Sequence, residues 1–322
     1  MSVANIGSRW DKTGFEGSLD FFRKDNGASI LTLTEGGPVF PNPTGALDYF
    51  VDLNRSTSGD GLSPDTAFTT IAEAITASNT SIGLTANRWW ARRNRIFVMG
   101  DGIDEDLTVL PEKCDIIGIG SDLVPYPRVI GHHTIAAAKV GCRFINIGFQ
   151  LDGTGVGITI PAGCHGFQIL GGMLQPAAAG NTVGVQITDS ALVKIQGFEI
   201  HQNPAAYGTG ICAVGIAIAG TASNHQTLID NCFIEATEGI DVVASAPAYG
   251  SRISNNLIKA TALTIDENSD VVIVAWNELI TAANGNTDCA GAIDANAALS
   301  IGNRITSGNT ANCPYPIVDI AQ

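Results

Sequence analysis

The amino-acid sequence predicts an all-β protein that winds as a parallel β-helix, a solenoid in which equivalent short strands stack on one another. The first observation is a recurring phrase with a small second residue, seen as VGITI, VGVQI, VGIAI, EGIDV and TALTI. Its small residue falls at Gly157, Gly184, Gly215, Gly239, Ala262 and Ala292, at steps of 23 to 31 residues. Repeats of about 20–50 residues are typical of solenoids, because one repeat cannot bury its apolar side without a neighbour.

The second observation is another phrase that follows the first at a similar distance, seen as IQGFEI, IDNCFI, ISNNLI, AWNELI and IGNRIT. Its third position is Gly197 and then an asparagine in each later copy: Asn231, Asn255, Asn277 and Asn303. An asparagine at a bend tolerates left-handed backbone, and its amide can bond the same residue in the coils above and below. We therefore predict that these four asparagines form an internal ladder.

Residues 1–45 are predicted to form an arm, a hairpin and a linker. The β-rich runs within 18–34 flank Asp25-Asn26-Gly27, and Asn-Gly is a strong signal for a tight hairpin turn. A two-stranded hairpin is marginal alone, so it should pack on the body, a sister chain or a partner. The Pro- and Gly-rich stretch 36–45 then breaks regular structure.

Residues 46–94 are predicted to cap the solenoid, and residues 95–322 to form its body of about eight coils. In the cap, Thr70 and Glu73 have the spacing of a capping box and predict the start of a short helix. Ile71, Ala74 and Ile75 would share its apolar face. In the body, inward Ile, Val, Leu and Phe alternate with outward polar residues, as half-buried strands require.

The turn and helix start at 59–71 (GDGLSPDTAFTTI) resemble the opening of right-handed parallel β-helix proteins of the pectate-lyase-like superfamily. The resemblance implies a right-handed solenoid whose first coil is covered by the helix. It leaves the function open, because lyases, binding proteins and virion proteins share this fold.

Charge excludes some partners. The chain of 322 residues has a net charge of −14, and its charged residues make up only 15%. Residues 144–322 hold four basic residues against fourteen acidic ones, which would repel phosphate backbones and anionic membranes. We expect neither nucleic acid nor membrane as a partner. The low charge favours an assembly, although a solenoid can also be poor in charge by itself.

Seven cysteines lack CxxC spacing and any Cys/His cluster of zinc type. We expect structural thiols, with a disulfide between Cys289 and Cys313 as the alternative, and no metal or cofactor. No signal peptide is recognised at the start of the chain, which favours synthesis in a reducing cytoplasm.

Enzymes of this fold cleave glycans, and hydrolysis needs two carboxylates that face each other. Three groups of acidic residues are candidates, and several of their members fall at turns, where carboxylates are commonly solvated: Asp101, Asp104, Glu105 and Asp106; Asp230, Glu235, Glu238 and Asp241; Asp266, Glu267 and Asp270. We expect no pair to align across neighbouring coils, and so no catalytic residue.

The segments NIGSRW (5–10) and SLDFFRKDNGASILTL (18–33) resemble the opening of phage virion proteins in which an arm and hairpin precede an outward-facing domain. The resemblance implies a non-enzymatic capsid decoration protein, located in the virion, that docks on the major capsid protein or another virion protein. Such β-helical proteins usually form homotrimers. The docking residues would be Trp10, Phe15, Phe21, Phe22, Trp89, Trp90 and Arg92. The last three could instead form an edge beside the first strand, with arginine stems covering apolar surface.

The alternative function is a tailspike or tail fibre that binds or cleaves host surface polysaccharide. Two turns, 203–210 and 246–251, each present a tyrosine between small residues, Tyr207 and Tyr249. Tyrosine is a common contact residue for sugars and proteins, so these two are candidate glycan contacts. Ordinary loop tips remain the other interpretation.

Overall fold

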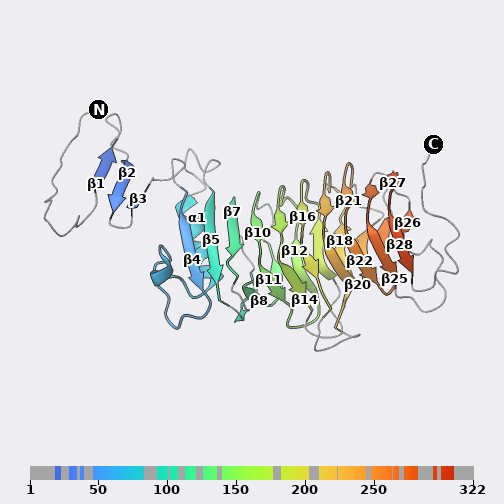
Figure 1. Ribbon diagram of the computed structural model, residues 1–322, viewed down its shortest axis with the longest axis horizontal. Helices are drawn as coiled ribbons and strands as arrows, with labels where there is room; N and C mark the ends of the chain where they lie inside the picture. Colours follow the sequence, from blue (N-terminus) through green and yellow to red (C-terminus); the bar gives the residue numbers. More distant parts are fainter. Residues whose placement is uncertain are drawn as a thin grey trace.

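The computed structural model describes the chain as a β protein with mostly parallel strands (Figure 1). The described residues are 19–22, 29–34, 37–39, 46–82, 93–100, 102–107, 113–120, 126–135, 140–176, 183–202, 210–222, 224–243, 248–262, 264–267, 272–281, 293–295 and 299–307. Within this part of the chain there is one α-helix, and no helix is long and apolar enough to cross a membrane.

The first three strands form an antiparallel sheet of their own: β1 (Leu19–Phe22), β2 (Ser29–Thr34) and β3 (Gly37–Val39). Leu19 pairs with Leu33 and Thr34 pairs with Gly37. The predicted pairing within 18–34 is therefore confirmed, and β3 adds a strand where the sequence predicted a linker.

A second sheet has ten strands, all of them parallel, in an order that follows the chain. Its strands are β4 (Asp48–Asp52), β5 (Asn94–Met99), β7 (Cys114–Gly118), β10 (Arg143–Ile145), β13 (Gln168–Leu170), β16 (Lys194–Gln196), β19 (Leu228–Asp230), β21 (Arg252–Ser254), β24 (Ile273–Ala275) and β27 (Leu299–Ile301). The middle residue of each three-residue strand stacks on the middle residue of the next, as Phe144 does on Ile169. This column faces the core, because Phe144, Ile169 and their equivalents are buried.

A third sheet has fifteen strands in two parallel stacks that share one long strand, β20 (Phe233–Val242). One stack contains β6 (Ile103–Asp104), β8 (Arg128–Ile130), β11 (Gly148–Gln150), β14 (Met173–Gln175), β17 (Glu199–Ile200), β22 (Leu257–Ala260), β25 (Glu278–Thr281) and β28 (Arg304–Ser307). The other contains β9 (His133–Thr134), β12 (Val156–Ile160), β15 (Val183–Thr188), β18 (Cys212–Ala219), β23 (Ile265–Glu267) and β26 (Ile293–Ala295). The first half of β20 pairs with β17 and β22, and its second half pairs with β18 and β23.

The core lies between these stacks and is filled mainly by β-branched aliphatic residues. Near the middle it also holds four fully buried phenylalanines, Phe144, Phe149, Phe167 and Phe198. The ring of Phe144 lies edge-on to those of Phe149 and Phe167, with centroids 5.1 and 5.5 Å apart, a favoured aromatic geometry. One continuous cluster of buried apolar residues thus runs from Tyr49 to Leu279.

Helix α1 (Ile71–Ile82) packs against β4 and β5, near the start of the strand stacks (Figure 1). The predicted capping box is confirmed, since Thr70 N donates to Glu73 Oε2 at 3.1 Å and Glu73 N donates to Thr70 Oγ1 at 3.2 Å. A second carboxylate, that of Glu105, accepts from the N–H groups of Ile71 and Ala72 at 2.9 and 2.6 Å. Both carboxylates satisfy backbone donors that a helix start leaves free, and they complement the helix dipole.

Gly157, Gly184, Gly215 and Gly239 stack in one column, as the first recurring phrase predicts. A Cβ atom on Gly184 would lie 2.6 Å from the carbonyl oxygen of Gly215, so the backbones approach too closely for a side chain. The residue stacked next is Thr264 rather than the predicted Ala262, because Ile240 pairs with Ile265. The alignment of TALTI was therefore displaced by two residues, since this coil is longer than the phrase alone suggested.

We expect Gly184→Ala to lower the free energy of unfolding by about 1–3 kcal/mol, because the new methyl group must displace backbone of the next strand. Thermal or denaturant unfolding followed by circular dichroism would measure the loss. Gly153→Ala is the matched control, since its added Cβ would first meet His132 Nε2 at 3.6 Å, an ordinary contact distance. Equal stability of the two variants would contradict the close approach.

Candidate functional site

An asparagine ladder is present: it contains Asn277 and Asn303, as predicted, and Asn256, which was not predicted. Asn277 Nδ2 donates to Asn303 Oδ1 at 2.9 Å, and Asn256 Nδ2 donates to Asn277 Oδ1 at 2.9 Å. The same oxygens accept from the backbone N–H groups of Asn256 and Asn277, and Asn256 Oδ1 accepts from that of Cys232. All three asparagines are buried, so the ladder satisfies backbone groups that would otherwise be orphaned inside the protein.

Asn231 and Asn255 do not belong to this ladder, which corrects the prediction for these two residues. They occupy the preceding position, with left-handed φ angles of 53° and 57°. The register pairs Ser254 with Ala275, so Asn255 stacks on Trp276 and Asn256 stacks on Asn277. The error arose because AWNELI and IGNRIT enter the strand one residue later than the earlier copies of the phrase.

Most of the predicted docking residues lie outside the described part of the chain: Trp10, Phe15, Trp89, Trp90 and Arg92. Phe21 and Phe22 are placed in β1 by their backbone. Of the candidate glycan contacts, Tyr207 also lies outside it. Tyr249 is described; its side chain is 55% exposed and stacks on His225, with ring centroids 5.2 Å apart.

The five described cysteines are buried thiols that form no disulfide: Cys114, Cys142, Cys164, Cys212 and Cys232. Burial raises the thiol pKa of Cys142 and of Cys212 to about 12, which keeps both protonated and unreactive at neutral pH. These properties agree with the predicted structural role. Cys289 and Cys313, the alternative disulfide pair, lie outside the described residues.

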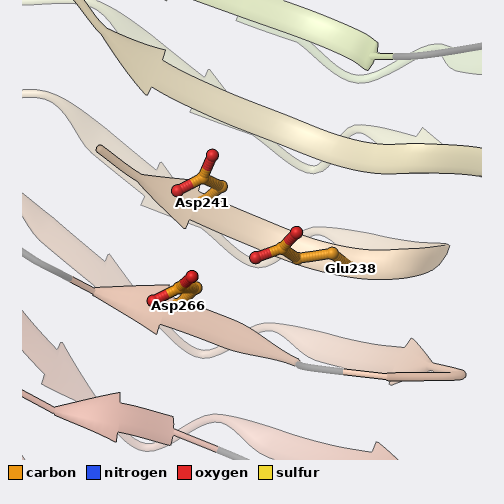
Figure 2. Close-up of side chains that lie close together, drawn as sticks. All are labelled: Glu238, Asp241 and Asp266. Carbon is orange, nitrogen blue, oxygen red and sulfur yellow. The ribbon is translucent and has the colours of Figure 1, made fainter. Parts of the chain in front are cut away.

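Three carboxylates gather on the outer face of the stack that contains β18 and β23 (Figure 2). Glu238 and Asp241 come from β20, and Asp266 comes from β23. One oxygen of each lies within 4.8 Å of an oxygen of the other two. Strict alternation would place Glu238 and Asp241 on opposite faces, but it is broken here: both are partly exposed, whereas Gly239 and Ile240 between them are buried.

This cluster contradicts the prediction that no carboxylates align across neighbouring coils. Asp241 pairs with Asp266, and Asp266 pairs in turn with Asp294 of β26. The two-residue displacement of TALTI concealed this column, because it moved Asp266 out of line with Asp241. A comparison of EGIDV with TIDE (264–267) would have revealed it.

Burial and the neighbouring carboxylates raise the pKa values of two members of the cluster, Glu238 and Asp241. Partial burial and the nearby charges of Asp241 and Asp266 raise the pKa of Glu238 from 4.5 to about 7. Burial and Asp266 also raise the pKa of Asp241. No cationic side chain is among the groups that act on either pKa. Glu238 can therefore hold a proton at neutral pH, which like charges at short distance favour.

This arrangement is capable of two kinds of chemistry. A protonated carboxyl beside an ionised one is the pair that glycoside hydrolysis requires, one as proton donor and one as nucleophile or base. The same three oxygens are hard ligands of the kind that Ca²⁺ prefers, although Ca²⁺ takes about 6–8 oxygen ligands.

A second charged cluster lies on the stack that contains β17 and β22. His201 Nε2 lies 2.7 Å from Glu199 Oε2, and Lys259 Nζ donates to Glu235 Oε1 at 2.9 Å. Glu235 also accepts from the N–H of Gln202. Lys259 and Glu235 form an ion pair and the ring of His201 bonds Glu199, so these side chains satisfy one another and the cluster has a structural explanation.

Comparisons with known proteins identify no relative: no family model matches the chain, and no curated protein matches it.

The Glu238→Gln variant should lose part of the pH dependence of stability. The folded pKa of Glu238, about 7, exceeds its ordinary value of 4.5, so its stabilising contribution is complete below pH 4.5 and is lost as pH rises through 7. A neutral amide does not carry the charge that the cluster repels. We expect the variant to gain up to about 1 kcal/mol relative to wild type between pH 5 and pH 8, because solvent screens the repulsion at this partly exposed site.

Denaturant unfolding of both proteins across this pH range would measure the difference. Glu278→Gln, the same chemical change on the neighbouring stack, serves as the control. Parallel stability curves for wild type and Glu238→Gln would show that the three carboxylates do not interact.

Proposed function

We propose that the chain is a structural protein of a bacteriophage virion, a capsid decoration protein that docks through residues 1–45 and presents its strand stacks outward. The observation that carries the proposal is the division of the strands. β1, β2 and β3 pair among themselves in an antiparallel sheet, whereas the strands from β4 onward form parallel stacks. Residues 5–10 and 18–33 resemble the opening of phage virion proteins. We therefore assign docking to the antiparallel sheet and the outward-facing part to the parallel stacks.

The fold that we propose for the stacks is a right-handed parallel β-helix of about eight coils. Support comes from the constant pairing of each strand with its equivalent one repeat later, in register and in the same direction. Strand β20 belongs to two stacks. A chain that bends sharply from one face of a β-helix to the next would produce such a shared strand. Right-handedness follows the general rule for parallel crossovers, of which about 98% are right-handed.

The partner in this proposal is the major capsid protein or another virion protein, and the assembly is a homotrimer formed in the host cytoplasm. A low charged fraction of 15% supports association, because side faces with few charges lose little hydration when they are covered. A closed three-fold ring would bury three equivalent contacts.

Deletion of residues 1–45 should abolish binding to particles and leave a folded β-protein, because the removed strands pair only among themselves within the described residues. Co-sedimentation with purified phage heads that lack this protein would test binding, and circular dichroism would test folding. A chain with Asp20→Asn, a change within β1 that keeps its length, is the control. Retained binding by the truncated protein would refute the docking role. Light scattering of the full chain should give three times 33.4 kDa.

The second candidate function is cleavage of a neutral host surface polysaccharide, and the cluster of Glu238, Asp241 and Asp266 favours it. Glu238 would donate a proton to the leaving oxygen, and Asp241 or Asp266 would act as the nucleophile. Oxygen separations within 4.8 Å are close to the about 5–5.5 Å of enzymes that retain anomeric configuration.

If this second function is correct, incubation with a panel of polysaccharides should release reducing ends. Glu238→Gln should lower the rate at least about 100-fold, because an amide cannot donate the proton. Glu278→Gln should leave the rate unchanged. Absence of release by the wild-type protein, or full activity of Glu238→Gln, would exclude this cluster as a hydrolytic site.

A further inference from the structure

Trp276 is an outlier in the column of residues that end the strands of the ten-stranded sheet. From β10 to β27 each residue of this column has a left-handed φ, and these members are Asn146, Gly171, Gly197, Asn231, Asn255, Trp276 and Gly302. Glycine and asparagine tolerate this conformation, whereas a bulky aromatic residue is strained by it. Trp276 nevertheless has a φ of 54°. Local strain of this kind is often retained because the side chain has a function.

The side chain of Trp276 is held at the surface and is not used to fill the core. It is 54% exposed. The next residue in the column, Gly302, makes room for its ring, because a Cβ on Gly302 would lie 2.4 Å from Cδ1 of Trp276. The guanidinium carbon of Arg252 lies 5.5 Å from the ring centroid, a cation–π distance. The indole is thus positioned by a glycine and an arginine while much of it faces solvent.

Arg252 is an unusual cation for this part of the chain. Arg252 forms no ion pair with a described carboxylate, but its positive charge acts on the nearby carboxylate of Asp230. Arg95 and Arg143 on the same face form ion pairs with Asp48 and Asp115. Lys194 has no ion pair with a described residue either, and it stacks in the same outward column as Arg252, with Leu228 between them. Among the described residues, Lys194 and Arg252 thus place two cations without an ion pair along one line of the surface, with the Asp230 carboxylate beside Arg252.

Polar groups next to Trp276 are held rigidly. Asp230 Oδ1 accepts from Ser254 Oγ and Asn255 Nδ2, both at 2.8 Å, and Asp230 Oδ2 accepts from Gln196 Nε2 at 3.0 Å. Asn255 is exposed, with its amide fixed by this contact. The outward face between β16 and β24 thus combines a flat aromatic ring, two cationic side chains and oriented polar groups.

We propose that Trp276 and Arg252 form a binding site for an acidic polysaccharide. A pyranose ring has a flat face of C–H groups that packs on an indole, and its hydroxyl groups bond to oriented polar side chains. Guanidinium groups bind carboxylates through paired donors, so Arg252 would hold a uronate carboxylate while the sugar covers Trp276. Lys194, two strands away at about 9–10 Å, would meet a further carboxylate along the same polymer.

This inference is independent of the docking role of residues 1–45. It is also separate from the acidic cluster, which lies on a different sheet and would repel such a polymer. A second copy of the chain is the other conceivable occupant of this face. A second copy has the same net charge of −14 and would also be attracted to Arg252 and Lys194. We favour the polysaccharide because a uronate polymer binds these cations and also packs a sugar ring on Trp276.

The test compares Trp276→Asn with Leu192→Asn. Leu192 is the matched control, since it is also 54% exposed and has a left-handed φ of 60°, but it lies in a different turn. Both substitutions place a residue that tolerates this backbone, so neither should lower the melting temperature. Affinity electrophoresis in gels with alginate, polygalacturonate or hyaluronan is the measurement, with dextran as the neutral polymer.

We expect at least one uronate polymer to retard the wild type and Leu192→Asn equally. Trp276→Asn should bind at least tenfold more weakly, and Arg252→Gln should lose binding to the uronate polymer with a reduced dependence on salt. Retardation of no variant by any uronate polymer would overturn the proposal, as would equal binding by Trp276→Asn. A fall in oligomeric mass for Trp276→Asn, measured by light scattering without any polymer bound, would assign the face to a second copy and also overturn it.

Discussion

Parallel pairing in register is the constraint on which the rest of this structure depends. Each strand satisfies its backbone hydrogen bonds with the equivalent strand of the next repeat, so every side chain lies over its own equivalent. Apolar residues in such a column form a continuous core. Amides in a column bond one another, as Asn256, Asn277 and Asn303 do. A small residue in a column allows close backbone approach, as Gly184 does over Gly215.

Pairing in register also decides which charges meet, because residues that follow one another in a column lie next to each other. Where signs alternate, neighbours pair: Arg95 binds Asp48, and Arg143 binds the nearly buried Asp115 through Nε at 2.7 Å. Where like charges follow one another, as Asp241 and Asp266 do, the carboxylates repel, which together with burial raises the pKa of Asp241. The protein carries both arrangements on different sheets. The alternating column is explained by stability, whereas the acidic one costs stability and so points to a use.

Each functional hypothesis concerns a different part of the protein. Attachment to a virion concerns residues 1–45, polysaccharide cleavage concerns the outer face of β20 and β23, and polysaccharide binding concerns the outer face of β21 and β24. A decoration protein that also holds surface glycans would use the first and the third together. Binding could then concentrate particles at a host surface without any cleavage, which the separation of Arg252 from the acidic cluster permits.

The sequence by itself determined the β-rich repeats, the helix start at Thr70 and Glu73, the pairing within 18–34 and the glycine column. These features depend on short-range spacing or on residue types that only one local conformation accepts. Only the tertiary structure decided the register between distant repeats, because the loops vary in length and each loop shifts what stacks on what. One residue of shift moved Asn255 out of the ladder and brought Asn256 into it. Two residues of shift concealed the pairing of Asp241 with Asp266, and the strained, exposed Trp276 became visible only when its column was known.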